Sequence, residues 1–584
     1  MTLKPEPTRG KHYAVAVPGT EEEQSKRAIN PPSAYTLRGS TSLFTVYYDT
    51  SLGAEGQKMA DAVLGRCDSD YKMLFNFFGD LTPGNLPFQI YIDGGSSGGW
   101  HAGCYNTLIH ADDFGGDKDL VNVVNVAEIS EVFMASQGIG WDCGSSNGEG
   151  LSRVLAAVAY AYAFPEFATG AIWLDSARPD WVTSNEPTDR DNFATGCSAL
   201  FLNYLRHQLD FSWMKIVLCG APSLSQTYTK LTGRDDAFAP FAALLQQRFP
   251  AGTASGLVGD NPFPVNQQLQ LCGLTQDGNV WHAIRFPDTL WTPFGNVKGQ
   301  AGDPGQFVAI ASAGVNREYQ VAGITADGGM WHTIRHVDGS WTPFGNVKGQ
   351  AGDPGPFVTL ACARVDGELQ LCGITADGKT WHTIRHIDGS WEPFVDVIAK
   401  VGDDPGPFVS IACTCVSGRL EVCCVATDGN LWHTARGGLW WLGQVDPNDH
   451  WYPFENVSLA LSNTFNPGRF TNVSCAGVIG LTWEGDLLKV CSTTDDGGMW
   501  YTSHNSLGWT PVENVKGGAG DPGRFDAVGC ATVNEDLQVS GITADGGMWH
   551  AILQPDGLWT QFGNVKGQSG DPGQFGAVSC GGLG

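Results

Sequence analysis

The phrase WTPFGNVKGQAGDPG occupies residues 291–305 and returns unchanged at residues 341–355. Four looser copies follow: WEPFVDVIAKVGDDPG, WYPFENVSLALSNTFNPG, WTPVENVKGGAGDPG and WTQFGNVKGQSGDPG. A second phrase precedes each copy; it reads W-H-A-I-R at Trp281 and decays to W-Y-T-S-H at Trp500. A repeat of about 50 residues is typical of solenoids, propellers and related arrays, so it decides the fold of the C-terminal half.

Each unit contains four short runs rich in β-forming residues. In the second unit they cover 307–313, 319–325, 330–336 and 341–347, and Asn316-Arg317 and Asp338-Gly339 supply turns between them. Four antiparallel strands without helical periodicity predict one propeller blade per unit. A single sheet cannot bury both of its faces, so we expect the two tryptophans of each unit to pack between adjacent blades.

The ends of the repeat region predict how the ring closes. The first unit starts at Gln267 with its second strand, and the missing first run appears only at 575–580, as FGAVSC. The C-terminal strand then completes the first blade. The sequence therefore predicts an all-β six-bladed propeller over residues 264–584. A seventh blade from the preceding segment is the alternative, which lacks a supporting tryptophan pair.

Length and composition limit the remaining possibilities. A chain of 584 residues is expected to form at least two domains, and we assign 1–35 to an irregular arm and 36–255 to an α+β domain. The net charge of −27 disfavours a nucleic-acid partner. We expect no membrane span, because no apolar run is long enough. The first residues lack a long apolar segment, so a cytoplasmic location is expected, with non-classical release as the alternative.

The repeat cysteines occupy positions where other units carry Ala or Ser. Cys362 and its counterparts align with Ser312, and Cys372 and its counterparts align with Ala322 and Ser540. Such positions favour small buried side chains. We expect reduced structural thiols there, with cross-strand disulfides as the alternative.

Residues 36–255 do not repeat, and their β-rich runs at 43–48, 87–92 and 106–110 precede most of the helices. Helices are predicted at 56–78, 120–137, 149–162, 192–207 and 237–248. The segment VAEISEVFM, residues 126–134, aligns with the zinc-peptidase pattern H-E-x-x-H. Ala127 and Glu131 take the two histidine positions, and Glu128 takes the position of the general base.

Glu149 follows Glu131 by eighteen residues, in SNGEGLSRVLA. This spacing resembles that of thermolysin-like (gluzincin) metallopeptidases, which implies a metallopeptidase-like domain with Glu128 as catalytic base and Glu131 and Glu149 as metal ligands. Ala127 cannot bind a metal, so the site is degenerate and enzymatic activity is not favoured. Three carboxylates would suit Ca²⁺ or Mg²⁺ better than Zn²⁺. The alternatives are solvated or helix-capping carboxylates and a working hydrolase. His101 and His110 are either replacement ligands or structural residues.

The paired tryptophans, DG hairpins and W-H-x-x-R phrase resemble tectonin-type and fucose-binding lectin propellers. The resemblance implies sugar binding in clefts between blades, with glycans or glycoproteins as partners. The candidate ligand-binding residues are Trp281, Trp331, Trp381, Trp432, Trp549, His332, Arg335, His382 and Arg385, together with Trp440 and Trp441 of an insertion described below. The alternative for the histidines and arginines is interblade hydrogen bonding. The recurring lysines, such as Lys298, are expected to cap turns or pair with the Asp of GDPG.

One unit departs from the regular spacing. Trp432 and Trp500 lie 68 residues apart, where neighbouring units show about 50, and the extra residues fall at 437–450 and 478–485. Trp440 and Trp441 make the first insertion apolar, which favours docking against the N-terminal domain over a ligand site. The function predicted is carbohydrate binding. The alternatives are a metal-dependent peptidase whose propeller captures substrate, and a protein-binding scaffold.

Overall fold

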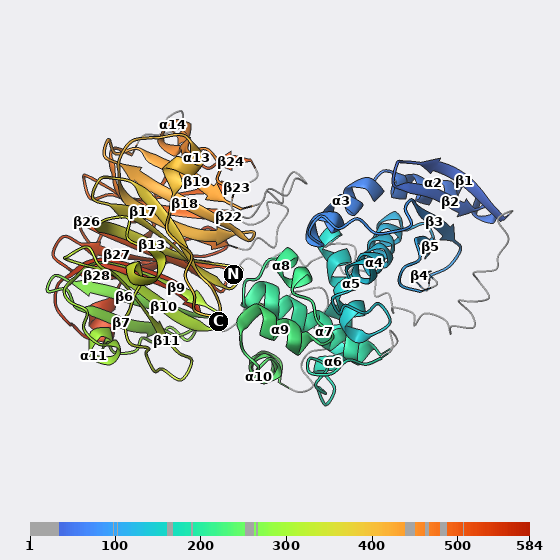
Figure 1. Cartoon of the computed structure of the whole chain (residues 1–584), viewed down its shortest axis with the longest axis horizontal. Helices are drawn as coiled ribbons and strands as arrows, with labels where there is room; N and C mark the ends of the chain where they lie inside the picture. Colours follow the sequence, from blue (N-terminus) through green and yellow to red (C-terminus); the bar gives the residue numbers. More distant parts are fainter. Residues whose placement is uncertain are drawn as a thin grey trace. The chain divides into compact units, whose positions relative to one another are not determined.

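The repeated phrases fold into six antiparallel sheets (Figure 1). The structure is a computed structural model that describes residues 34–96, 98–101, 103–160, 167–187, 191–250, 262–263, 267–437, 450–461, 467–478, 487–505 and 507–583. Contacts between Cα atoms divide the chain into two units. We call them the N-terminal unit, within residues 34–263, and the propeller unit, within residues 267–583.

Each blade of the propeller unit is built from three main strands and a short outer strand. Blades 1 to 3 are β30 (Phe575–Leu583), β6 (Gln268–Thr275), β7 (Val280–Arg285) and β8 (Gly295–Asn296); β9 (Phe307–Val315), β10 (Glu318–Thr325), β11 (Met330–Arg335) and β12 (Gly345–Asn346); and β13 (Phe357–Val365), β14 (Glu368–Thr375), β15 (Thr380–Arg385) and β16 (Val395–Asp396).

Blades 4 to 6 follow the same order, and blade 5 carries one additional short strand. They are β17 (Phe408–Val416), β18 (Arg419–Ala426), β19 (Leu431–Arg436) and β20 (Glu455–Asn456); β21 (Phe470–Val478), β22 (Leu487–Thr494), β23 (Met499–Asn505), β24 (Gly508–Trp509) and β25 (Glu513–Asn514); and β26 (Phe525–Val533), β27 (Asp536–Thr543), β28 (Met548–Leu553) and β29 (Gly563–Asn564).

The predicted closure of the ring is confirmed. Strand β30 pairs with β6 in antiparallel register, from Phe575 opposite Thr275 to Leu583 opposite Gln268. The first strands of the blades neighbour one another in the order β9, β13, β17, β21, β26 and β30, and β30 returns to β9. The C-terminal strand therefore supplies the first strand of blade 1, and the propeller has six blades.

Turns and loops use the residues that the repeat supplies for them. Asn316 and Arg317 both have positive φ, 50° and 66°, in the hairpin between β9 and β10. A short helix follows each outer strand: α11 (Val297–Ala301), α12 (Lys348–Ala351), α13 (Val397–Val401), α14 (Val457–Leu461), α15 (Val515–Ala519) and α16 (Val565–Ser569). Lys298 pairs with Asp303 of the GDPG loop at 2.8 Å, and Lys348, Lys516 and Lys566 make the same contact in their own blades.

The tryptophans pack between blades, as predicted. Trp381 and Trp391 of blade 3 lie against an apolar cluster that contains Met330 and Leu371, so the cluster draws on blades 2 and 3. Equivalent clusters hold the tryptophan pairs of the other blades. Each blade thus packs its two tryptophans, most of them partly buried, against the interface with its neighbour.

The N-terminal unit contains a five-stranded mixed sheet in the order β1-β2-β3-β5-β4. Strands β2, β3 and β5 are parallel, and the edge strands β1 and β4 are antiparallel to their neighbours. The strands are β1 (Tyr35–Ser40), β2 (Phe44–Asp49), β3 (Phe88–Asp93), β4 (Gly99–His101) and β5 (Leu108–Asp112). This is an α/β arrangement, and its metallopeptidase-like identity stays a prediction.

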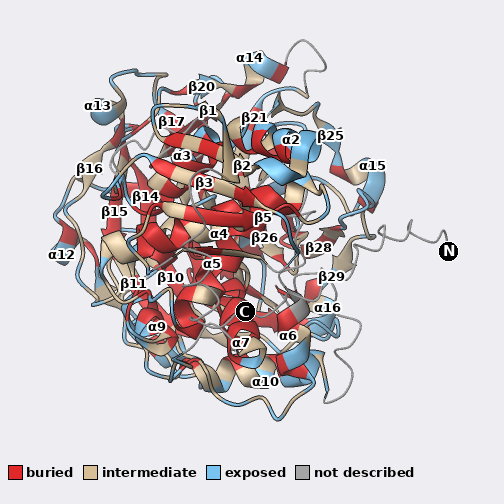
Figure 2. Ribbon diagram, turned by 90° about the vertical axis from the view of Figure 1, so that its right-hand side faces the viewer, coloured by how far each residue is buried: buried red, intermediate tan, exposed pale blue. Residues whose placement is uncertain are grey.

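Helices cover this sheet and form most of the rest of the unit. They are α2 (Gly53–Leu64), α3 (Cys67–Phe77), α4 (Lys118–Gln137), α5 (Ser146–Ala159), α6 (Phe167–Leu174), α7 (Asn192–Asn203), α8 (Trp213–Leu218), α9 (Leu224–Thr232) and α10 (Phe238–Arg248). The single helix predicted at 56–78 is two helices, α2 and α3, separated at Gly65 and Arg66. Helices α4, α5 and α7 contribute many buried residues to the unit (Figure 2), and α4 packs on both α5 and β5.

Candidate functional site

The tryptophans of the W-H-x-x-R phrase are held by their own blades. The indole Nε1 of Trp381 donates to Thr375 Oγ1 at 3.2 Å. Trp281, Trp331 and Trp549, which were also predicted to bind ligand, make the same bond. Trp432 differs, because its Nε1 is buried without a partner among the described residues. The predicted tryptophans therefore form part of the blade interfaces.

The histidines of the same phrase are buried between blades. His332 Nε2 lies 2.9 Å from Gln320 Oε1, and its ring faces the edge of Trp391 of the next blade, with centroids 5.5 Å apart. Burial, with a further contribution from Arg385, lowers the pKa of His332 to about 3. His382 pairs with Gln370 in the same way and also has its pKa lowered to about 3. Both imidazoles are neutral at pH 7, and their contacts fit the structural role that the sequence left open.

The arginines of the phrase have a different environment. Arg285, Arg335 and Arg385 are half-buried, and burial lowers their pKa values from the usual value. Their backbones are paired in the blade sheets, but none of the three guanidinium groups makes a hydrogen bond or an ion pair among the described residues. Their guanidinium groups therefore have donors available for a ligand at the blade interfaces.

Two interfaces also bring a carboxylate into range of such an arginine. Arg385 of blade 3 interacts electrostatically with Glu318 of blade 2, and Arg285 of blade 1 interacts with Asp536 of blade 6. We call these two places the arginine clefts. The cleft between blades 2 and 3 contains Arg385, Trp391, His332 and Glu318; the one between blades 6 and 1 contains Arg285, Trp291, His550 and Asp536.

Trp291, Trp391, Glu318 and Asp536 were not among the predicted site residues. The tryptophans begin the repeated WTPF phrase and could have been found there. Glu318 and Asp536 open the second strands of blades 2 and 6. The residue at this position varies from blade to blade, so no sequence pattern pointed to them.

Blade 4 replaces the glutamine of the histidine pair by a glutamate. His433 Nε2 lies 2.7 Å from Glu421 Oε2, and Arg419 Nε lies 2.6 Å from Glu421 Oε1. Burial lowers the pKa of His433, but the hydrogen bonds to Glu421 and Glu455 outweigh it and raise the pKa to about 10. The interface between blades 4 and 5 therefore holds a charged imidazole.

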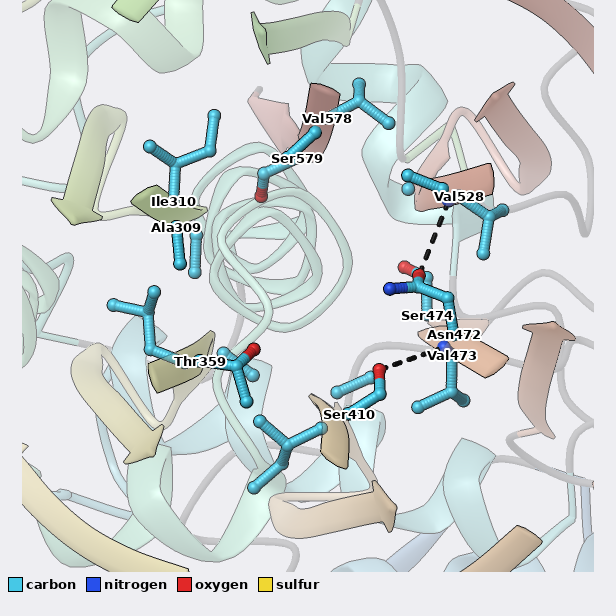
Figure 3. Close-up of a pocket in the computed structure, with 18 of the residues that line it drawn as sticks. Ala309, Ile310, Thr359, Ser410, Asn472, Val473, Ser474, Val528, Val578 and Ser579 are labelled. Carbon is cyan, nitrogen blue, oxygen red and sulfur yellow. Dashed lines mark hydrogen bonds between the residues drawn. The ribbon is translucent and has the colours of Figure 1, made fainter. Parts of the chain in front are cut away.

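A cavity of about 240 Å³ lies where the first strands of the six blades meet (Figure 3). Its lining is polar on one side, with Ser410, Asn472 and Ser474, and apolar on another, with Ile310. Ser410 Oγ accepts a hydrogen bond from the backbone N–H of Val473 at 3.2 Å. Hydrogen bonds of the polar lining thus connect neighbouring blades and stabilise the ring.

In the N-terminal unit, one histidine and two glutamates meet. His101 of β4 lies 3.0 Å from Glu131 and 3.5 Å from Glu128, both on α4, measured from Nε2 to a carboxylate oxygen. Burial lowers the pKa of His101, but the hydrogen bond to Glu131 and the charges of both glutamates outweigh it and raise the pKa to about 9.

The other residues predicted for this site lie in different contacts. Glu149 of α5 pairs with Arg153, at 2.6 Å from Oε1 to Nη2. His110 Nδ1 bonds Asp93 Oδ2 at 2.7 Å, and its ring stacks on Trp100. The structure thus brings Glu128 and Glu131 together with His101.

The cysteines of the repeat are free thiols, as expected, and those of the inner positions are buried. Burial raises the pKa of Cys272 to about 12, which keeps it protonated and unreactive. A disulfide joins Cys104 to Cys143 in the N-terminal unit. This bond lies outside the repeat positions and was not predicted from the sequence.

Trp440 and Trp441 lie outside the described residues, as do most of 437–450 and 478–485. The predicted docking of the propeller on the N-terminal domain therefore stays a prediction. None of the helices in the described part of the chain is long and apolar enough to cross a membrane.

No known family model matches this chain, and no curated protein sequence matches it. Among solved structures it is similar to the lectin of the fungus Aleuria aurantia, described as a six-bladed β-propeller with a fucose recognition mode; the identity is 15%, the match covers 52% of this chain and 92% of the lectin, and the TM-score is 0.39. It is also similar to the BP39L lectin from Burkholderia pseudomallei: the identity is 13%, the match covers 51% of this chain and 80% of that lectin, and the TM-score is 0.36. For AofleA from Arthrobotrys oligospora the identity is 9%, the match covers 54% of this chain and 93% of AofleA, and the TM-score is 0.35. The six blades of this chain are established by its own strand pairing.

Proposed function

We propose that the propeller unit binds neutral carbohydrate at the arginine clefts. The observation that carries the proposal is the half-buried arginine without a hydrogen-bonding partner among the described residues, placed beside an indole of its own blade. A sugar ring offers hydroxyls that accept from a guanidinium and a C–H face that packs on an aromatic ring. The combination therefore suits a polyol.

The carboxylates of the clefts favour a neutral ligand over an anionic one. Glu318 and Asp536 each lie within electrostatic range of the cleft arginine. A phosphate or carboxylate ligand would be repelled by them, whereas a sugar hydroxyl can donate to the carboxylate and accept from the arginine. The net charge of −27 also disfavours anions.

The repetition of the cleft implies multivalent binding. Individually weak sites on one ring gain avidity on a surface that displays many copies of a glycan. Arg335 offers the same guanidinium between blades 1 and 2, where Gln268 stands in place of the acidic residue. We expect this third site to be weaker.

A glycan array probed with the full chain tests the proposal, with fucosylated, galactosylated and methylated sugars on the array. The panel includes α-methyl-L-fucoside, the ligand in one structure of the Aleuria aurantia lectin. The triple variant Arg285→Met, Arg335→Met and Arg385→Met should lose binding at least tenfold. The control Arg524→Met changes an exposed loop arginine and should bind normally. Absence of any hit with the unmodified chain, or hits that survive the triple variant, would contradict the proposal.

We further propose that the N-terminal unit is not a working gluzincin-like peptidase. Ala127 cannot act as a ligand, and the charge of Glu149 is neutralised by Arg153. Assay of the full chain against peptide substrates with added Zn²⁺ tests this proposal, and activity that is lost on Glu128→Ala would overturn it. The cytoplasmic location expected from the sequence remains a proposal, and fractionation of expressing cells would test it.

A further inference from the structure

We infer that His101, Glu128 and Glu131 bind a divalent first-row transition metal ion, independently of sugar binding by the propeller. The candidate ligand atoms are His101 Nε2 and one carboxylate oxygen of each glutamate, and all three lie within 4.8 Å of one another. Zinc bonds to nitrogen and oxygen of about 2.0–2.2 Å, in tetrahedral geometry, place neighbouring ligand atoms roughly 3.3 Å apart. The separations of 3.0 and 3.5 Å between His101 and the glutamates are close to that value.

The orientation of the imidazole fits a metal ligand. His101 Nδ1 lies 3.0 Å from the carbonyl oxygen of Gly103, to which its N–H donates. A backbone carbonyl in this position fixes the tautomer that directs the Nε2 lone pair away from it, here toward the two carboxylates.

The backbone holds the three ligands together before any ion binds. Glu128 and Glu131 are three residues apart on α4 and therefore share a face. Strand β4 passes very close to that face: a Cβ on Gly99 would lie 2.4 Å from Val124 Cγ1 and 2.8 Å from Glu128 Cγ. Only glycine permits this approach. The Cys104–Cys143 disulfide then ties the segment after His101 to the loop between α4 and α5.

Burial and donor chemistry indicate the class of ion. The side chains of His101, Glu131 and Glu128 are 3%, 11% and 14% exposed, so the site is largely buried, and the glutamates are buried less completely than the histidine. One imidazole nitrogen with two carboxylate oxygens suits Zn²⁺, Co²⁺, Mn²⁺ or Fe²⁺ rather than the all-oxygen ions Ca²⁺ and Mg²⁺. Three protein ligands leave a coordination position for water. The sequence-based set of Glu131 and Glu149 is thereby replaced by one that includes the strand histidine.

The experiment titrates the chelator-treated full chain with Co²⁺ and follows visible absorption and calorimetric heat. We expect one Co²⁺ per chain, with a spectrum of nitrogen and oxygen ligation. His101→Ala and the isosteric Glu131→Gln should each weaken binding at least tenfold. Glu149→Gln removes a carboxylate of the neighbouring helix that pairs with Arg153, and should leave binding unchanged.

Several results would overturn the inference. They are no saturable binding, equal affinity in His101→Ala, or thiolate-to-cobalt charge-transfer bands that place the ion on a free cysteine. Circular dichroism confirms that each variant is folded before it is titrated. Glycan binding measured on the same preparations distinguishes failure of this inference from failure of the proposed function, since neither His101 nor Glu131 belongs to an arginine cleft.

Discussion

Glu421 and His433 form a charged hydrogen-bonded pair, 2.7 Å from Oε2 to Nε2, at a position where four other blades pair glutamine with histidine. The pKa of His433 is raised to about 10, while that of His332 is lowered to about 3. Both rings are buried on equivalent strands. The carboxylates of Glu421 and Glu455 therefore keep the His433 imidazole positively charged, where the glutamine-paired imidazoles are neutral.

Exchanging the two partners should move the two pKa values in opposite directions. In Glu421→Gln we expect the pKa of His433 to fall from about 10, because only Glu455 then remains to offset the burial of the ring. In Gln370→Glu the pKa of His382 should rise from about 3. Histidine side-chain NMR over a pH series measures both values. An unchanged pKa of His433 in Glu421→Gln would contradict this account.

The glutamine-paired histidines predict loss of stability in acid. His282, His332, His382 and His550 have pKa values of about 3 when folded and 6.5 as the reference value. The unfolded chain therefore binds more protons below pH 6.5, and stability falls as the pH drops from 6.5 toward 3. Each of these histidines lowers the free energy of unfolding by about 2 kcal/mol at pH 5. His433 has the opposite effect: its contribution to stability is fully present below pH 6.5 and is lost as the pH rises through 10.

Urea unfolding followed by tryptophan fluorescence at pH 7 and pH 5 measures the acid effect. The variant His332→Gln should lose less stability between the two pH values than the unmodified chain, by about 2 kcal/mol. An equal loss in both proteins would show that His332 is not buried as a neutral group.

Much of the propeller could be predicted from its repeat, and the misplaced details have physical causes. The strand predicted at 341–347 is reduced to Gly345–Asn346. Pro343 lies within the predicted run and has no N–H to donate to a ladder, so regular pairing begins only after it. In the N-terminal unit, the apolar pattern of 56–78 continues through Gly65, and sequence alone could not show that the chain changes direction there.

The candidate sites were harder to predict, because each combines residues that the chain order separates. Arg385 and His332 belong to different repeat units, and only the packing of blade 3 on blade 2 brings them together. His101 was named as a possible replacement ligand, but its contact with Glu131 depends on how closely β4 passes over α4. That approach depends on the missing side chain of Gly99.

The inner strands should tolerate a methyl group at one glycine and reject it at another. A Cβ on Gly477 would lie 1.8 Å from the carbonyl oxygen of Cys415 in the neighbouring blade, whereas nothing lies within 4 Å of a Cβ on Gly576. We expect Gly477→Ala to cost about 1–3 kcal/mol or more through overpacking. Gly576→Ala should change stability by less than about 1 kcal/mol. Denaturant unfolding measures the free energy of unfolding of both variants. Equal losses of stability would contradict the close approach of blades 4 and 5.

The disulfide of the N-terminal unit should contribute substantially to its stability. Cys104 and Cys143 are 39 residues apart, and closing a loop of that length restricts the unfolded chain by about 4 kcal/mol. The double variant Cys104→Ser and Cys143→Ser should therefore unfold at lower urea concentration. Reductant should reproduce the effect in the unmodified chain and have no further effect in the variant. A reductant effect of the same size in the variant would assign the loss to other cysteines.

The pairing of β30 with β6 sets an order of events during synthesis on the ribosome. Blades 2 to 6 each consist of strands contiguous in the chain and can form as they emerge. Strand β6 is synthesised long before its partner, which ends at Leu583, so this edge of β6 stays open until the residues up to Leu583 have been translated. An open edge can pair with another nascent chain. On a polysome, β6 is therefore the strand at which two copies of this protein would first exchange partners, and the stretch that a chaperone would most usefully cover.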